Sequence, residues 1–195
     1  MSFLWSSKQT RTDEQIMRFL AGDDVVLDRH LLLYDMQATA AHAVGLARIG
    51  ILTEAESSSI NAELETLAEQ YCAGDLVLDE HFEDGHSAIE FWLAERLGPV
   101  GEKVHTGRSR NDQVLVATRL FMRDALNDLS QLCQASAESC LIQARDYRHC
   151  PMPGYTHMQR AVVSSVGMWF AAFAEAFIDN AVLVRATRSW IDANP

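Results

Sequence analysis

The chain has 195 residues, of which 48% are hydrophobic, and it carries a formal net charge of −11 at pH 7. The length suits one domain, or one domain and part of another. The hydrophobic share suffices for a buried core and excludes a disordered acidic tail. The acidic balance argues against nucleic acids and anionic membranes as partners, because both attract basic surfaces. A local basic cluster can still hold an anionic ligand.

The cysteines and the distribution of apolar residues indicate a cytoplasmic protein. The four cysteines form no C-x-x-C pair and follow no secretory leader, so we expect reduced thiols. No stretch approaches the roughly 18 to 20 consecutive apolar residues of a membrane span, so we expect no membrane contact.

The first half of the chain carries the signals of successive helices. A short helix capped by Thr12 is expected before Gly22, and a second helix over about 28–48. Thr53 and Glu56 have the spacing of a capping box and open a third helix. Apolar residues recur at steps of three and four in the first and third of these helices, at Ile16, Phe19 and Leu20 and at Ile60, Leu64, Leu67 and Tyr71.

Two long helices are expected in the second half, after a polar stretch over 74–86 and a helix over about 87–97. The first, over about 112–147, contains neither Gly nor Pro, and the second covers about 163–192. One apolar stripe of the first consists of Leu115, Met122, Leu126, Leu129, Cys133, Ala137, Cys140 and Ala144, and another of Val114, Phe121, Ala125 and Leu132. The expected buried face of the second consists of Val166, Phe170, Phe173, Phe177, Ala181 and Val184.

The length of these helices predicts an assembly. A helix of roughly 36 residues is about 54 Å long, whereas a compact chain of this size has a diameter of about 42 Å. We therefore expect an all-α fold: an N-terminal helical domain over 1–107 leads into the first long helices of an oligomeric central bundle over 108–195. A bent helix within a monomer is the alternative. Because the last helix is still apolar near Asn194-Pro195, we expect a truncated bundle.

The segment HTGRSRND places a basic cluster just before the first long helix. It contains His105, Arg108 and Arg110, with Lys103 slightly upstream. Asp112 is a good capping residue, the free amides of a helix N-terminus favour anions, and arginine binds carboxylates through two hydrogen bonds. The cluster suits a carboxylate ligand; the alternative is a solvated turn whose arginines pair with local acids such as Asp112.

The segment PMPGYTHMQRA forms the second polar cluster. Pro151, Pro153 and Gly154 predict a tight loop, which places His157 just before a helix. Imidazole titrates near neutral pH and can give or take a proton there. The alternative is a structural, hydrogen-bonded histidine.

The acidic segment DEHFEDGHSAIE holds two histidines, His81 and His86. Their spacing matches neither a zinc site nor an EF-hand, so we expect no metal. An acidic loop with one functional histidine fits the segment better.

HTGRSRNDQ followed by PGYTHMQRA resembles the argininosuccinate lyases of the fumarase/aspartase superfamily, which includes delta-crystallin. LW near the start, LDRHLLLYD at 27–35, GIL at 50–52 and EDGHSAIE at 83–90 extend the resemblance over essentially all of the chain. The chain would be less than half of a typical family member. The resemblance implies a lyase of arginine biosynthesis that uses no cofactor, in a homotetramer with active sites shared among subunits.

The implied reaction is the reversible elimination of fumarate from argininosuccinate to give arginine. A base removes a proton beside a carboxylate, polar donors hold the carbanion-like intermediate, and the guanidino nitrogen leaves. The resemblance implies that His157 is the catalytic histidine of proton transfer. The matched substrate-binding positions are Asn111 and Thr156, with Ser109 and Arg110 beside them, and His86 near the site.

The sequence departs from the family pattern at three places. Asp24 stands where the family usually has a serine that touches substrate, and Val162-Val163 replace a common Gln-Pro. The family's mobile loop with the catalytic serine would lie beyond Pro195, so the isolated chain is expected to be inactive. Three other functions stay open: a different fumarate-yielding lyase, a non-catalytic crystallin-like scaffold and a metal-binding module.

Overall fold

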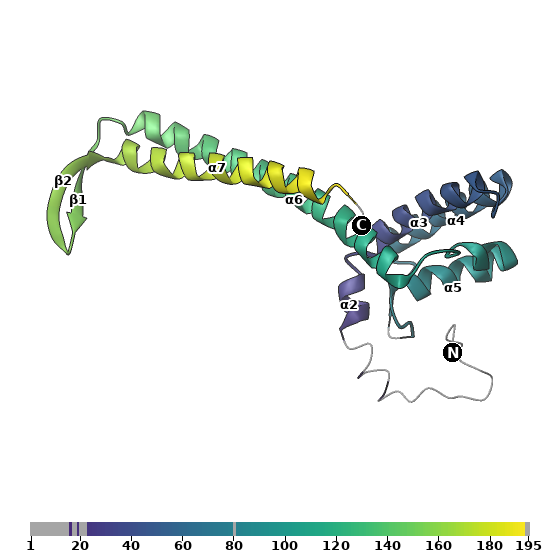
Figure 1. Ribbon diagram of the computed structural model, residues 1–195. Coiled ribbons are helices and arrows are strands. Elements are labelled where there is room, and N and C mark those ends of the chain that lie inside the picture. The colour runs from purple at the N-terminus through teal and green to yellow at the C-terminus, as the bar shows by residue number, and fades with distance from the viewer. Residues whose placement is uncertain (1–15, 17–18, 20–22, 80, 194–195) are drawn as a thin grey trace. The chain divides into compact units, whose positions relative to one another are not determined.

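The computed structural model describes residues 16, 19, 23–79 and 81–193. These residues form six α-helices, one 3-10 helix and a two-stranded antiparallel sheet (Figure 1). They divide into two compact units, Met1–Phe121 and Met122–Pro195, and helix α6 (Arg110–Asp146) contributes to both. The expected all-α class is confirmed, with the addition of a β-hairpin that the sequence analysis did not predict.

Helices joined by turns and irregular segments make up the described part of the first unit. Besides the start of α6 it contains α2 (Asp24–Asp28), α3 (Leu32–Arg48), α4 (Glu54–Ala73), α5 (Gly85–Leu97) and the 3-10 helix η1 (Gly98–Lys103). The single helix expected over 28–48 is wrong in its first turn, because the chain turns between α2 and α3. Ile16 and Phe19 are helical, but the rest of the short helix expected before Gly22, including its cap Thr12, lies outside the described residues.

The capping box at the start of α4 is confirmed and anchors η1. The Glu56 amide donates to Thr53 Oγ1 (3.2 Å), and the Thr53 amide donates to Glu56 Oε2 (2.7 Å). Lys103 Nζ of η1 donates to Glu56 Oε1 (2.6 Å). These hydrogen bonds lower the pKa of Glu56 to about 2, and the bond from Lys103 has the largest effect. The carboxylate therefore stays charged at any physiological pH.

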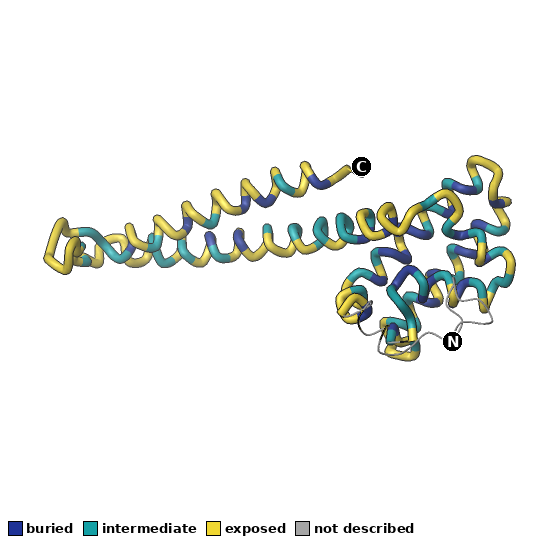
Figure 2. Tube along the Cα trace, turned by 60° about the horizontal axis from the view of Figure 1, so that its bottom comes forward, coloured by how far each residue is buried: buried dark blue, intermediate teal, exposed yellow. Residues whose placement is uncertain are grey.

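The hydrophobic core of the first unit lies between α3, α4 and α5. Figure 2 shows the buried residues gathered along these helices and more sparsely along α6 and α7 (Val166–Ile191). The largest fully buried apolar side chains are Leu32, Ile60, Leu67, Leu78, Ile89, Leu93 and Val104. Each helix therefore buries one stripe, which is the packing that the steps of three and four predict.

The second unit contains the rest of α6, α7 and a hairpin of strands β1 (Pro151–Thr156) and β2 (Gln159–Ser165). The loop expected at 151–157 is therefore wrong, because this segment forms β1 and the hairpin turn, and His157 lies in that turn instead of just before a helix. The helix expected over about 163–192 is confirmed, but it begins three residues later, at Val166. Prolines are tolerated here because a strand in a two-stranded sheet needs few ladder donors. The run Val162-Val163-Ser164-Ser165 favours strand over helix, and Ser165 caps α7 by accepting from the Met168 amide (3.0 Å).

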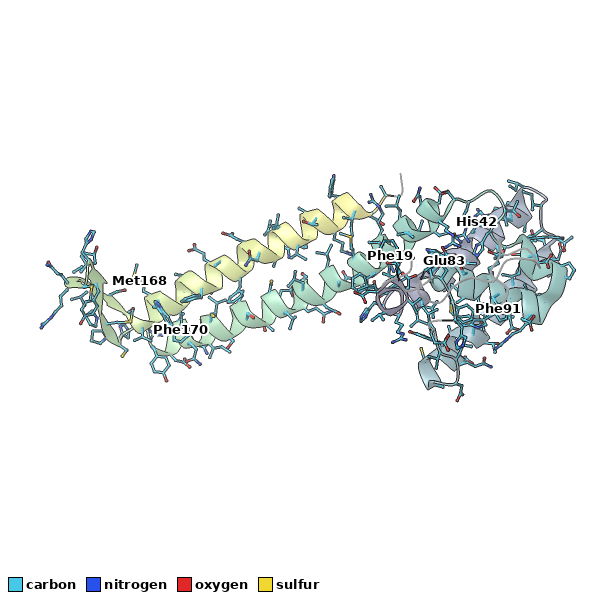
Figure 3. The ribbon with its side chains drawn as sticks, turned by 90° about the horizontal axis from the view of Figure 1, so that it is seen from below. Phe19, His42, Glu83, Phe91, Met168 and Phe170 are labelled. Atoms are coloured by element: carbon cyan, nitrogen blue, oxygen red, sulfur yellow. The ribbon has the colours of Figure 1, made fainter. Side chains whose placement is uncertain are left out.

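Helix α7 exposes many large apolar side chains. By length and composition it could cross a membrane, which the sequence analysis did not expect, and 17% of its apolar window is buried. Figure 3 shows Met168 and Phe170 at the end of α7 that adjoins the hairpin. The exposed large apolar residues of α7 are Met168, Trp169, Phe173, Ile178, Val182, Leu183 and Trp190.

Candidate active site

The start of α6 is built by Ser109 and Asp112. Ser109 Oγ accepts from the Asn111 amide (3.1 Å), and Asp112 Oδ2 accepts from the Ser109 amide (2.7 Å). Ser109 is therefore the cap, and Asp112, expected as the capping residue, is its acidic partner inside the first turn. Ser109, Arg110 and Asn111 are all exposed, so their polar groups are accessible to a ligand.

Arg110 is engaged by the start of α5. Its guanidinium pairs with Asp84, the N-cap of α5, donates to Ser87 Oγ (3.0 Å) and lies 3.7 Å from Glu83 Oε2. Two carboxylates thus already face its positive charge. The structure therefore brings Arg110 beside the segment that carries His86.

A buried polar network lies behind the basic segment. Arg108 Nη2 donates to Thr39 Oγ1 of α3 (3.2 Å) and lies 2.8 Å from His105 Nδ1. Gln113 Nε2 of α6 lies 2.7 Å from the same His105 nitrogen. Gly107, at φ +78°, provides the left-handed turn that leads to Arg108. The network joins α3, α6 and the segment between η1 and α6.

His105 is neutral in this network. Burial lowers its pKa to about 3, and the positive charge of Arg108 adds to the effect. Because Arg108 and Gln113 both present N–H donors to Nδ1, this nitrogen holds the lone pair and Nε2 carries the proton. The His105 ring is also hydrogen-bonded to the backbone of His86.

His86 and Asp35 form a buried pair. His86 lies in the first turn of α5 and is 7% exposed, and Asp35 of α3 is 1% exposed. His86 Nδ1 is hydrogen-bonded to Asp35 Oδ2. Asp35, Thr39 and Gln113 were not expected in the site from the sequence, although an acidic residue between Leu32 and Met36 on the apolar face of a helix is a signal for Asp35.

Thr156 and His157 lie in the second unit, at the turn of the hairpin. His157 (φ +49°) and Met158 (φ +62°) form a two-residue turn between Thr156 and Gln159. Two successive positive φ angles fit the type I′ turn of hairpins, which is usually built with Asn and Gly. Non-glycine residues in this conformation are uncommon and gather at functional sites. Both side chains are exposed, Met158 at 99%.

The other histidine of the acidic segment forms a local pair. His81 Nδ1 lies 2.8 Å from Asp79 Oδ1, and both side chains are exposed. Within the described part of the chain, no three His, Cys, Asp or Glu side chains gather as metal ligands. All four cysteines are free. Asp24, the departure from the family's serine, is exposed at the start of α2.

A family profile described as "Lyase" matches residues 9–193. The chain belongs to this lyase family. It is 54% identical to the argininosuccinate lyase of Stenotrophomonas maltophilia (strain R551-3) over 98% of this chain, and 55% identical to that of Xylella fastidiosa (strain 9a5c) over 100%. The chain spans 44% of the length of each relative.

Solved structures of other lyases share the fold. EDDS lyase in complex with formate matches 96% of this chain and 37% of its own, with a TM-score of 0.74 and 28% identity. A fumarate lyase:delta crystallin from Brucella melitensis matches 93% of this chain and 45% of its own, with a TM-score of 0.68. At 16% identity the second likeness concerns the fold alone.

Proposed function

We propose that the protein containing this chain is an argininosuccinate lyase, which eliminates fumarate from argininosuccinate and gives arginine for arginine biosynthesis in the cytoplasm. The observation that carries the proposal is 52 to 55% identity to proteins of that name over 98 to 100% of the chain. The fold of lyase structures and the polar start of α6 support it.

The start of α6 suits a substrate with several carboxylates. Asn111 and Ser109 offer exposed side-chain donors at the start of a helix, where the helix dipole favours anions. Arg110 already faces Asp84 and Glu83. We therefore assign direct substrate contacts to Asn111 and Ser109. The proposed role of Arg110 is to hold the start of α5 beside these two residues.

His157 is the proposed proton-transfer group, with Thr156 as its substrate-binding neighbour. A two-residue turn with both φ angles positive holds the histidine backbone in a defined conformation. Positioned acid–base groups typically contribute about 10² to 10⁴ in rate. The exposure of His157 in a single chain agrees with an active site that other subunits complete.

We propose a homotetramer with shared active sites, a helical domain over 1–107 and a central bundle from 108. The 37 residues of α6 make a helix about 55 Å long. Helix α7 exposes large apolar side chains that need covering. Helices of other subunits, rather than a membrane, are the proposed cover.

The test is fumarate release from argininosuccinate by the full-length protein that contains this chain. We expect turnover, a loss of at least about 100-fold in the His157→Asn variant, and none from residues 1–195 alone. His149→Asn, an exposed histidine just after α6, is the matched control and should keep wild-type activity.

Other outcomes select other functions. Fumarate release from a different amino acid adduct, but not from argininosuccinate, would assign another lyase; EDDS lyase, whose variant D290M/Y320M has been solved with bound fumarate, is 28% identical to this chain. A folded full-length protein without turnover or argininosuccinate binding would favour the crystallin-like scaffold.

A further inference from the structure

We propose that Asp35 is a positioning residue of the active site, whose buried carboxylate fixes the His86 ring with Nδ1 toward α3 and leaves Nε2 for the substrate. The reaction concerned is the one proposed above, on which this inference rests. The geometry comes from α3, α5 and the segment that leads into α6.

The pair is buried deeply enough to fix the ring. The side chains of His86 and Asp35 are 9% and 2% exposed, so little water competes for their hydrogen bond. An ionised carboxylate only accepts hydrogen bonds, so His86 Nδ1 must be the donor. A neutral His86 ring then carries its lone pair on Nε2, the nitrogen left for a ligand.

The main chain of His86 is held as well as its ring. Its backbone is hydrogen-bonded to the His105 ring, whose Nδ1 faces donors from Arg108 and Gln113. The Asp84 side chain, which caps α5, also pairs with Arg110. The residue is thus fixed by the same segment that presents Ser109 and Asn111.

Asp35 also interacts electrostatically with Arg108. Its Oδ1 and the Nε of Arg108 are both buried and have no hydrogen-bond partner among the described residues. One is an acceptor, the other a donor, and Arg108 already binds Thr39, one helical turn after Asp35 on α3. The positive charge of Arg108 therefore balances the carboxylate that positions His86.

Kinetics of the full-length protein test the role. Removing the carboxylate behind an oriented histidine costs about 10- to 100-fold in metal sites, and we expect Asp35→Asn to lower kcat/KM on argininosuccinate by that amount. If Asp35 acts through His86, adding Asp35→Asn to His86→Asn causes no further loss. Additive losses would overturn the proposal.

A matched control is available in the same segment. Asp79→Asn removes the carboxylate of the exposed Asp79–His81 pair, and kcat/KM should stay at the wild-type value. An equal loss in the Asp35 and Asp79 variants would reflect a general effect of charge and would overturn the specific role of Asp35.

A spectroscopic test needs no folded variant of Asp35. Solid-state NMR of the wild-type protein labelled with ¹⁵N-histidine measures the protonation of each ring nitrogen. The signal that is absent from the His86→Asn variant belongs to His86, and it should show a protonated Nδ1 hydrogen-bonded to a carboxylate. An unprotonated Nδ1 would overturn the proposal, even if the Asp35→Asn variant does not fold. If the wild-type protein releases no fumarate, the proposed function fails, while this spectrum still decides the pairing.

Discussion

At the scale of single residues, the fold keeps the imidazole of His105 in its neutral form. Its ring is largely buried, and Nδ1 faces donors from Arg108 and Gln113. A proton added to Nδ1 would meet two donors, one of them the Arg108 guanidinium, instead of an acceptor. The lowered pKa, about 3, follows from this burial and from the neighbouring positive charge.

This predicts that the protein loses stability in mild acid. The folded pKa of about 3 lies below the unfolded value near 6.5, so between these values the unfolded chain binds a proton that the folded chain does not. The contribution of neutral His105 to the free energy of unfolding is fully present above pH 6.5. It falls as pH decreases toward 3, by at most about 1.4 kcal/mol per pH unit.

Urea unfolding at pH 7 and pH 5 measures this loss against a variant. His105→Gln keeps an acceptor for Gln113 but removes the titration, so its free energy of unfolding should change less between the two pH values. Equal changes in wild type and variant would show that other groups cause the acid sensitivity.

At the scale of elements, the contact between α6 and α7 depends on one glycine. A Cβ at Gly167 would lie 2.4 Å from the Ala144 carbonyl oxygen and 2.5 Å from Arg148 Cα. The Gly167 amide donates to the Tyr147 carbonyl (3.0 Å). The end of α6 and the start of α7 therefore touch through backbone atoms that cannot rotate away, as a side chain could.

We expect Gly167→Ala to lower the free energy of unfolding by about 1 to 3 kcal/mol, the usual cost of overpacking. The matched control is Gly45→Ala in α3, where nothing lies within 4 Å of the added Cβ. Alanine is the better helix former, so the control should be neutral or stabilising by up to about 1 kcal/mol. Thermal unfolding of both variants measures the difference, and equal midpoints would contradict the close contact.

At the scale of the whole molecule, periodicity predicts most of the fold but not its polar interior. Steps of three and four between apolar residues place the helices, because each helix buries one stripe. The hairpin escapes that pattern, because two prolines and a glycine in β1 are typical of loops. The Asp35–His86 pair escapes it too, since the two residues are far apart in sequence and meet only when α3 packs beside α5.

The same limit applies to the candidate site. The motif at 105–112 indicates a cationic cluster, but the sequence does not show that Arg108 turns inward to Thr39 while Arg110 pairs with Asp84. Which arginine is buried depends on the turn at Gly107 and on the acids just before α5. The motif therefore indicates the residue types of the site, and tertiary packing decides their roles.

Assembly is the property that α7 predicts most directly. Leu183 is 65% exposed on a helix with several other large apolar side chains in water, and such surface usually marks an interface. We expect Leu183→Glu in the full-length protein to lower the mass measured by sedimentation, because a buried unpaired charge at an interface is costly. Val77→Glu, which alters an apolar residue 56% exposed in the first unit, is the control and should leave the mass unchanged. A Leu183→Glu protein of unchanged mass would mean that other subunits do not cover this part of α7, and fumarate release by the same sample would show whether the active site needs that contact.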